Sequence, residues 1–366
     1  MRRFLRYGTT TGACAAAAAK AALSTLLGNP VDRVVIPSPI GIRFEIPVRE
    51  CRKFNEDTAV ASVVKDAGED IDATNKLEIL ATVRLTEDGK ITIKGSKGIG
   101  VATKPGLQVP IGESAINPVP RKMIEDGIRE ILPPGKGVEV IVSVPEGEEV
   151  AKKTLNLKLG IVGGISIIGT TGIVKPLSLA ACRRSLVPQI DVAIANGHER
   201  IFVVPSNIGE RITKQLFKAP EDAIVQTGDF MGYMLDKAVE KGVKNIIILG
   251  HPGKLVKLAA GIFNTHHKVA DARNEVIGAY AGAVGADTNL INAILQSNTT
   301  EEAIGLLTRA KLVRPTFDKI AEKISSRVRE RVSNKASIGV ILVSMEGDIV
   351  GIDQNARCTE PWLKSI

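Results

Sequence analysis

The chain has 366 residues, of which 44% are hydrophobic and 24% charged, so two domains with substantial cores are expected and a disordered chain is excluded. Only 3% of the residues are aromatic, which argues against a stacking platform for single-stranded nucleic acid. The net charge of +8 is spread along the chain without a basic stripe or docking motif, so it suits a polyanionic ligand better than a nucleic acid duplex.

Residues 1–155 are predicted to form an α+β domain. The alanine-rich segment 13–27 follows the loop Gly8-Thr9-Thr10-Thr11-Gly12 and is expected to be helical until Gly28-Asn29-Pro30 ends it. A second helix is expected at 120–132, and Glu87-Asp88-Gly89 indicates a hairpin turn. Strands are predicted at 33–36, 43–48, 59–64, 77–85, 90–94 and 138–144.

Residues 156–335 are predicted to form an α/β domain with a largely parallel sheet, because strands alternate there with helices. The expected strands are 164–168, 201–204, 223–225 and 245–249, and the later helices are 276–284, 290–295, 301–307 and 317–332. The chain closes with a hairpin, 337–343 and 349–352. Two strands alone are marginally stable, so we expect segment 336–366 to complete the sheet of the first domain, which makes the α/β domain an insertion.

Four glycine-bearing loops follow predicted strands of the α/β domain, where ligands bind open parallel sheets. Their glycines allow close approach of a ligand, and the N–H groups at a helix start favour anions; Asp229 or Glu210 suits ribose hydroxyls. Ordinary turn and cap glycines are the alternative interpretation, and the phosphate-loop and Gly-x-Gly-x-x-Gly patterns are absent. The predicted ligand residues are Gly169, Thr170, Thr171, Gly172, Ser206, Asn207, Gly209, Thr227, Gly228, Asp229 and Gly250.

Three of the four histidines lie between Gly250 and Arg273, together with Lys254 and Asp271. A polar lining with a titrating histidine is one interpretation, and a helix that starts at Thr265 is the other. No metal site is predicted, since adjacent histidines rarely point to one centre and no His-Glu-x-x-His motif occurs. The four cysteines are far apart and suggest reduced thiols in a cytoplasmic protein, and no segment is long and apolar enough for a membrane span.

Several long stretches of the chain are specific enough to compare with known families: 7–22, 103–107, 115–121, 151–156, 163–172, 250–257, Asn264-Thr265-His266, and Ala270-Asp271 with Arg273. In this order, over residues 5–275, they resemble the CbiD family of cobalt-precorrin-5B C-methyltransferases from anaerobic cobalamin biosynthesis. The chain departs from the family at Ala13, at His267 and in segment 69–76, so roles in that segment are not assigned.

The resemblance implies methyl transfer from S-adenosylmethionine to carbon 1 of a polyanionic corrinoid, with cobalt present only as part of that substrate. The ring carbon attacks the sulfonium methyl group, so the enzyme mainly aligns two reactants. His251, His266 and Asp271 are then candidates for acid–base roles. Candidates for substrate contacts are Thr10, Thr11, Lys104, Arg121, Lys254 and Arg273.

Two other functions stay open at this point. The same loops suit an enzyme that acts on a nucleotide or a phosphorylated molecule, and the basic charge suits a nucleic acid scaffold, although the composition argues against the latter. The sequence is compatible with a monomer and with a homo-oligomer.

Overall fold

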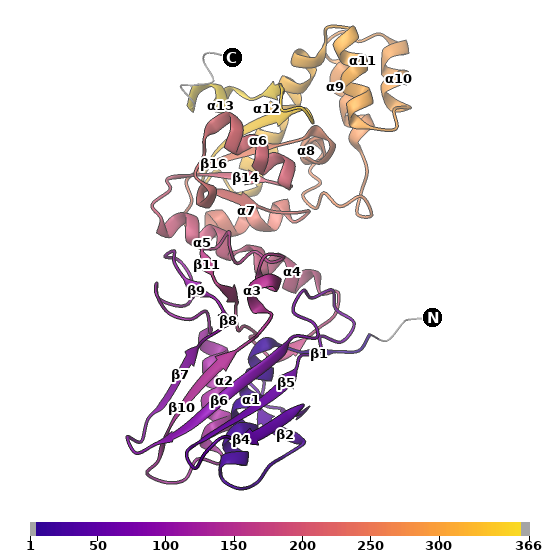
Figure 1. The fold of residues 1–366 in the computed structure, drawn as a ribbon. Coiled ribbons are helices and arrows are strands. Elements are labelled where there is room, and N and C mark those ends of the chain that lie inside the picture. The colour runs from indigo at the N-terminus through magenta and orange to yellow at the C-terminus, as the bar shows by residue number, and fades with distance from the viewer. Residues whose placement is uncertain (1–4, 360–366) are drawn as a thin grey trace. The chain divides into compact units, whose positions relative to one another are not determined.

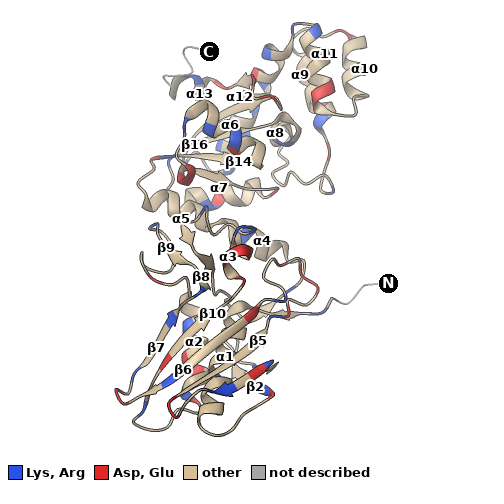
Figure 2. Ribbon diagram, viewed as in Figure 1, with Lys and Arg blue, Asp and Glu red and all other residues tan. Residues whose placement is uncertain are grey.

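The structure is a computed structural model that describes residues 5–359, and the chain forms two compact units that divide after Leu179 (Figure 1). Both units are mixed α/β structures: within the described residues unit 1 contains several sheets and unit 2 a single five-stranded sheet. Lysines and arginines occur on elements of both units (Figure 2). The division lies beyond the boundary expected at 155. Within the described residues, no helix has the length and apolar character needed to span a membrane.

Unit 1 is built on a five-stranded sheet in the order β4-β5-β6-β10-β7, antiparallel except for the β10–β7 pair. Its strands and helices confirm most of the expected segments. They are β1 (Gly8–Thr9), α1 (Thr11–Leu26), β2 (Arg33–Pro37), β3 (Arg43–Pro47), β4 (Glu50–Lys53), β5 (Thr58–Val64), β6 (Glu78–Thr86), β7 (Ile91–Gly95), β8 (Gly98–Ile99), β9 (Val101–Ala102), α2 (Pro118–Arg129), β10 (Gly137–Ser143), α3 (Gly147–Ala151), β11 (Ile161–Val162), β12 (Gly164–Ile165) and β13 (Ile173–Val174).

Helix α1 lies against β5, β6 and α2 and forms the centre of the unit 1 core. Of its 16 residues only Ser24 is not buried, because alanine side chains are small enough for the sheet and α2 to approach the helix closely. Thr10 caps the helix by accepting a hydrogen bond from the Ala13 N–H.

The turn at Glu87-Asp88-Gly89 occurs as predicted, but the hairpin is wrong. Strand β10 lies between β6 and β7, antiparallel to the first and parallel to the second, so the two strands joined by the turn do not pair. The turn is shaped by Asp88, whose Oδ1 accepts hydrogen bonds from the Lys90 N–H and the Thr86 hydroxyl.

Unit 2 has a second five-stranded sheet in the order β15-β14-β16-β17-β18, parallel except for the edge strand β18. Its elements are α4 (Leu179–Leu186), which starts at the division, α5 (Pro188–Ala195), β14 (Arg200–Val204), α6 (Asn207–Phe217), the 3₁₀ turn η1 (Glu221–Ala223), β15 (Ile224–Gln226), α7 (Met231–Glu240), β16 (Asn245–Gly250), α8 (Pro252–Ala259), α9 (Arg273–Gly282), α10 (Thr288–Leu295), α11 (Thr300–Arg309), α12 (Val313–Arg331), β17 (Ser337–Val343), β18 (Ile349–Ile352) and α13 (Gln354–Thr359).

Both faces of the unit 2 sheet are covered, which explains its continuous apolar strands. In β16, Ile246 and Ile248 belong to the core that includes α7, α8 and α12, whereas Ile247 and Leu249 belong to the smaller core beneath α6 and α13. Successive side chains of a strand point to opposite faces, so one strand serves both cores.

The expectation that segment 336–366 completes the sheet of the first domain is wrong. The expectation that the α/β domain is an insertion in the first domain is therefore wrong as well. β17 and β18 do form the predicted hairpin, but β17 pairs in parallel with β16 over six residue pairs, from Asn245 with Ser337 to Gly250 with Leu342. The helices α8 to α12 provide the long crossover that parallel neighbours require. Residues 360–366 of that segment lie outside the described residues.

Candidate functional site

The strand order of the unit 2 sheet creates a switch point between β14 and β16. The chain runs from β14 to β15 on one side and then crosses to β16 on the other side, so the loops that follow β14 and β16 diverge. In open α/β sheets, ligands bind in the crevice that such a divergence opens at the carboxyl ends of the strands. Three of the four glycine-bearing loops predicted from the sequence begin at this edge, directly after β14, β15 and β16.

The loop after β14 leads directly into α6. Ser206 is the N-cap residue, but its side chain makes no capping hydrogen bond, so N–H groups in the first turn of α6 have no side-chain acceptor from the cap. A Cβ atom on Gly209 would lie 3.1 Å from the Leu249 carbonyl oxygen, so glycine allows α6 to approach the end of β16. Asn207 accepts a hydrogen bond from Gln226 Nε2, which also donates to Glu210.

The loop after β15 carries Asp229, the centre of the polar contacts at this edge. Asp229 Oδ1 is 3.0 Å from Lys254 Nζ and accepts a 3.1 Å hydrogen bond from the Thr265 hydroxyl. Burial opposes ionisation of Asp229, but Lys254 and Thr265 outweigh it and lower the pKa of the carboxyl group. Both contacts use Oδ1, so Oδ2 is available to accept hydrogen bonds from a ligand hydroxyl. Thr227 at the start of this loop is buried, and Gly228 has a φ of 55° with open space at its Cβ position.

The loop after β16 holds His251 in a fixed orientation. His251 Nδ1 accepts a hydrogen bond from the Gly253 N–H at 3.0 Å, so the ring proton is on Nε2, which lies 2.6 Å from Glu301 Oε1. Both ring nitrogens are therefore engaged within the protein, which argues against the acid–base role expected for His251. A Cβ atom on Gly250 would lie 2.9 Å from Pro205 Cδ, so glycine at the end of β16 leaves room for the proline ring that follows β14.

Segment 264–273 is held at this edge by a buried lysine. Lys257 is 2% exposed, and its Nζ donates to the carbonyl oxygens of Thr265 and Ala270 at 3.1 and 2.9 Å. The segment is not helical until α9 begins at Arg273, so a helix starting at Thr265 is wrong. Sequence reasoning assigned Lys257 no role, although a lysine between Leu255, Val256 and Leu258 on a buried helix is itself a signal.

The other expected residues of this segment are less well placed for chemistry. His266 Nδ1 accepts a hydrogen bond from the Lys268 N–H, and its ring stacks on His267 with 4.5 Å between ring centroids. Asp271 and Arg273 form a two-contact ion pair with both distances at 2.7 Å. Arg273 is the first cause of the lowered pKa of Asp271, which is exposed and therefore unsuited to take up a proton near neutral pH.

The loop Gly169–Gly172 is part of unit 1 and does not belong to the strand ends of the unit 2 sheet. The strand expected at 164–168 is reduced to β12, which pairs with β8 of unit 1. The loop instead wraps the start of α1. The Thr11 hydroxyl accepts from the Ile168 N–H, and a Cβ atom on Gly169, whose φ is 135°, would lie 2.4 Å from Thr10 Oγ1. Thr10 and Thr11 are buried, whereas Thr170 is exposed and Thr171 Oγ1 accepts from Ile173 N–H.

Two further basic residues expected to bind substrate also lie in unit 1. Arg121 donates to the carbonyl oxygens of Ile116 and Ile93 at 3.2 and 2.9 Å, so it ties α2 to β7. Lys104 packs its side chain against Gly160, where a Cβ atom would lie 2.4 Å from Lys104 Cγ.

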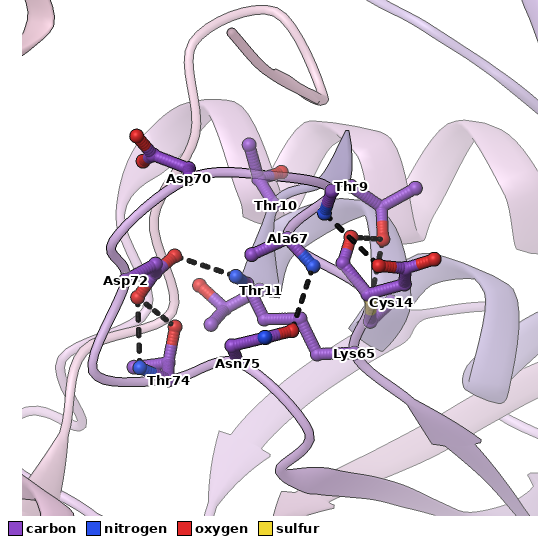
Figure 3. A network of polar contacts seen from close by, with 12 residues as sticks. Thr9, Thr10, Thr11, Cys14, Lys65, Ala67, Asp70, Asp72, Thr74 and Asn75 are labelled. Carbon is purple, nitrogen blue, oxygen red and sulfur yellow. Dashed lines mark hydrogen bonds and ion pairs between the residues drawn. The ribbon is translucent and has the colours of Figure 1, made fainter. Parts of the chain in front are cut away.

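The structure also contains an ion pair that the sequence does not predict, between a buried lysine and a half-buried aspartate near the threonine-rich loop, Gly8-Thr9-Thr10-Thr11-Gly12. Lys65 is 1% exposed, and its Nζ lies 2.6 Å from Asp72 Oδ2 (Figure 3). Asp72 belongs to segment 69–76, where the chain departs from the family pattern. Nearby, burial raises the pKa of Cys14 to about 11, and its Sγ is 3.3 Å from Thr9 Oγ1. Cys14 is thus a protonated core residue and no nucleophile.

Comparison with known proteins identifies the family. The family model for CbiD matches residues 1–176, and the model for "CbiD, C-terminal domain" matches residues 264–354. A cobalt-precorrin-5B C(1)-methyltransferase from Methanocaldococcus jannaschii is 48% identical over 352 residues, which cover 96% of this chain and 97% of that protein. The protein of the same name from Moorella thermoacetica is 46% identical over 355 residues, covering 96% of each.

A crystal structure of the cobalamin biosynthesis protein cbiD from Archaeoglobus fulgidus is 31% identical, covers 74% of this chain and 84% of its own, and has a TM-score of 0.39. The two family models together with near full-length relatives at almost half identity leave one assignment: the chain is a member of the CbiD family.

Proposed function

We propose that this chain is a cobalt-precorrin-5B C(1)-methyltransferase, which transfers a methyl group from S-adenosylmethionine to carbon 1 of cobalt-precorrin-5B and yields cobalt-precorrin-6A in anaerobic cobalamin biosynthesis. The observation that carries this proposal is the near full-length similarity to relatives of that name. Cobalt is part of the substrate. S-adenosylmethionine, when bound, supplies a methyl group on a sulfonium that is already activated for attack by the ring carbon.

The methyl donor is proposed to bind at the switch point of unit 2. Its chemistry fits the groups found there, because Asp229 Oδ2 can accept hydrogen bonds from ribose hydroxyls and the start of α6 offers N–H groups to a carboxylate. Gly209 lets α6 pack closely on the end of β16, and Gly250 leaves room for Pro205, so the ends of both strands and the start of α6 lie close together. Lys254 orients Asp229 and donates to the Pro205 carbonyl oxygen at 3.4 Å, so it connects the three loops.

The donor site mainly has to bind the methyl donor and to orient it toward the substrate. Within the donor site described above, both ring nitrogens of His251 are engaged by Gly253 and Glu301, and Lys254 helps to lower the pKa of Asp229. Holding two reactants in line can by itself supply a large part of a rate enhancement, on the order of 7–11 kcal/mol. We infer that positioning is the main contribution of the donor site.

Filling the crevice should weaken donor binding strongly. Ser206→Trp places a large side chain at the start of α6, and we expect isothermal titration calorimetry to show S-adenosylmethionine binding weakened by roughly 100-fold. Gln215→Trp, on the exposed side of the same helix, is the matched control and should bind as the wild type does.

The activity is tested with the same proteins. Wild type mixed with cobalt-precorrin-5B and S-adenosylmethionine should give a product heavier by one methyl group in mass spectrometry. Unchanged donor affinity in Ser206→Trp would show that the donor does not bind at the start of α6. A melting temperature raised by a nucleoside triphosphate but not by S-adenosylmethionine would contradict the proposed activity.

A further inference from the structure

Unit 1 contains a cavity of about 540 Å³ that the donor site does not involve. Its walls come from β3 and from the short ribbon in which β1 pairs with β13, Thr9 opposite Ile173. Two stretches that resemble the family, the threonine-rich loop and the Gly169–Gly172 loop, therefore meet at one wall. Its lining includes Arg6, Tyr7, Arg43, Phe44, Arg49 and Ile173.

The lining is largely apolar. Phe44, Val48 and Ile173 contribute hydrophobic side chains, and Tyr7, which is 55% exposed, adds an aromatic ring. Gly172 makes the arrangement possible, because a Cβ atom there would lie 2.5 Å from Phe44 Cε2. Its φ of 82° also favours glycine. An apolar wall with an aromatic ring suits the face of a large unsaturated ring system.

Three arginines, Arg6, Arg43 and Arg49, lie along the same cavity, and their side chains are 61%, 55% and 59% exposed. Each is oriented by a carboxylate outside or at the edge of the cavity: Asp66, Glu130 and Glu78 respectively. A guanidinium has five N–H donors, so these pairs leave donors on each arginine for a ligand.

The acidic side chains of the lining are already neutralised. Asp66 is bound by Arg6, which is the first cause of its pKa falling to about 2, and Glu45 is 3.1 Å from Arg33 Nη1. Among the lining residues, three arginines stand against two carboxylates, Asp66 and Glu45, so the cavity combines an apolar wall with a small excess of positive charge. Such a combination selects a ligand that is both a flat apolar ring and a polycarboxylate.

We propose that this cavity binds the substrate macrocycle, with one edge of the ring against Phe44 and Ile173 and its acetate and propionate carboxylates on Arg6, Arg43 and Arg49. The proposal rests on the proposed function for the identity of the ligand. The volume of about 540 Å³ lies within the roughly 300–1,000 Å³ typical of small-molecule sites. Planar, two-pronged donors are well suited to carboxylates.

The test uses uroporphyrin, a stable tetrapyrrole with eight carboxylates, as a fluorescent probe of the full-length protein. We expect the double variant Arg6→Gln with Arg49→Gln to bind the probe roughly tenfold more weakly than wild type, and added salt to reduce the difference. Arg43 is left in place because it also holds Glu130, which Lys20 contacts as well. Arg84→Gln is the matched control, since Arg84 is also 55% exposed and paired with a glutamate, but lies outside the cavity.

Kinetics separate this proposal from the proposed function. If the double variant raises KM for cobalt-precorrin-5B while KM for S-adenosylmethionine stays that of wild type, the cavity is the macrocycle site. If wild type methylates its substrate but the double variant matches Arg84→Gln in probe affinity and KM, the cavity assignment is overturned and the activity stands. If wild type binds the probe through the arginines but transfers no methyl group, the activity is overturned and the cavity keeps its polycarboxylate ligand.

Discussion

Replacing Asp72 by asparagine should lower the free energy of unfolding of unit 1 by about 3 kcal/mol. Lys65 is 1% exposed, and within the described residues Asp72 is its ion-pair partner, with 2.6 Å between Nζ and Oδ2. The substitution leaves a buried ammonium group without a counter-charge, and it weakens the two hydrogen bonds that Asp72 Oδ1 accepts from Thr74. Urea unfolding followed by circular dichroism measures the loss.

Two other variants show whether charge is the cause. Asp70→Asn is the matched control, because Asp70 lies in the same segment but accepts its hydrogen bond from the Leu177 N–H rather than from a cation. The pair Lys65→Met with Asp72→Asn removes both charges and should recover part of the lost stability. Equal losses for Asp70→Asn and Asp72→Asn would contradict the assignment.

The same pair predicts a pH dependence. Burial alone would raise the pKa of Asp72, but the charge and hydrogen bond of Lys65, with those of Thr74, outweigh it and lower the pKa below 3.8. A carboxyl group with a lowered pKa in the folded state stabilises the protein above its unfolded pKa and loses that effect as pH falls through the folded value. The advantage of wild type over Asp72→Asn should therefore be constant near neutral pH and shrink below 3.8.

Replacing Lys257 by methionine should weaken both unit 2 and donor binding. The ammonium group donates to the carbonyl oxygens of Thr265 and Ala270 in a site where Lys257 is 2% exposed. Methionine fills a similar space but leaves these acceptors without that donor, at a cost of about 2 kcal/mol. Because Thr265 donates to Asp229, loosening its segment should also weaken S-adenosylmethionine binding by roughly tenfold.

Comparing donor affinity with thermal stability distinguishes a positioning role of Lys257 from a general loss of stability. Lys257→Gln keeps an amide donor and should fall between wild type and Lys257→Met in calorimetric affinity for the donor. Lys237→Met removes a lysine on α7 that pairs with Glu240 on the surface, and it should match wild type in both measurements. A Lys257→Met protein that melts early but binds S-adenosylmethionine normally would show that Lys257 does not position the site.

The strand and helix positions follow from local patterns, but their pairing does not. The alanine segment predicts α1, and the turn at Asp88 is where the sequence places it. The insertion of β10 between β6 and β7, and the addition of β17 to β16, depend on contacts between residues far apart in the sequence. Local patterns predict that two consecutive strands pair as a hairpin. They cannot show that a strand from later in the chain lies between them.

The site shows the same division. The loops at Ser206, Asp229 and Gly250 could be expected to meet because parallel strands end at one edge of a sheet. A local pattern groups Gly169 with these loops because a strand precedes it, but that strand, β12, pairs with β8 of unit 1. Lys65 and Asp72 are seven residues apart with no periodic pattern to link them, so only the folded loop reveals the pair.

The near-complete burial of α1 has a use in following this protein in solution. Because residues 13–22 are all buried in the unit 1 core, we expect their amide hydrogens to exchange with deuterium mainly when that unit opens, and so to be among the slowest in it. The strand segment 246–249 occupies the equivalent place in unit 2. Mass spectrometry of these two peptides should therefore report the unfolding of each unit separately in the intact chain, with Asp72→Asn accelerating the first and Lys257→Met the second.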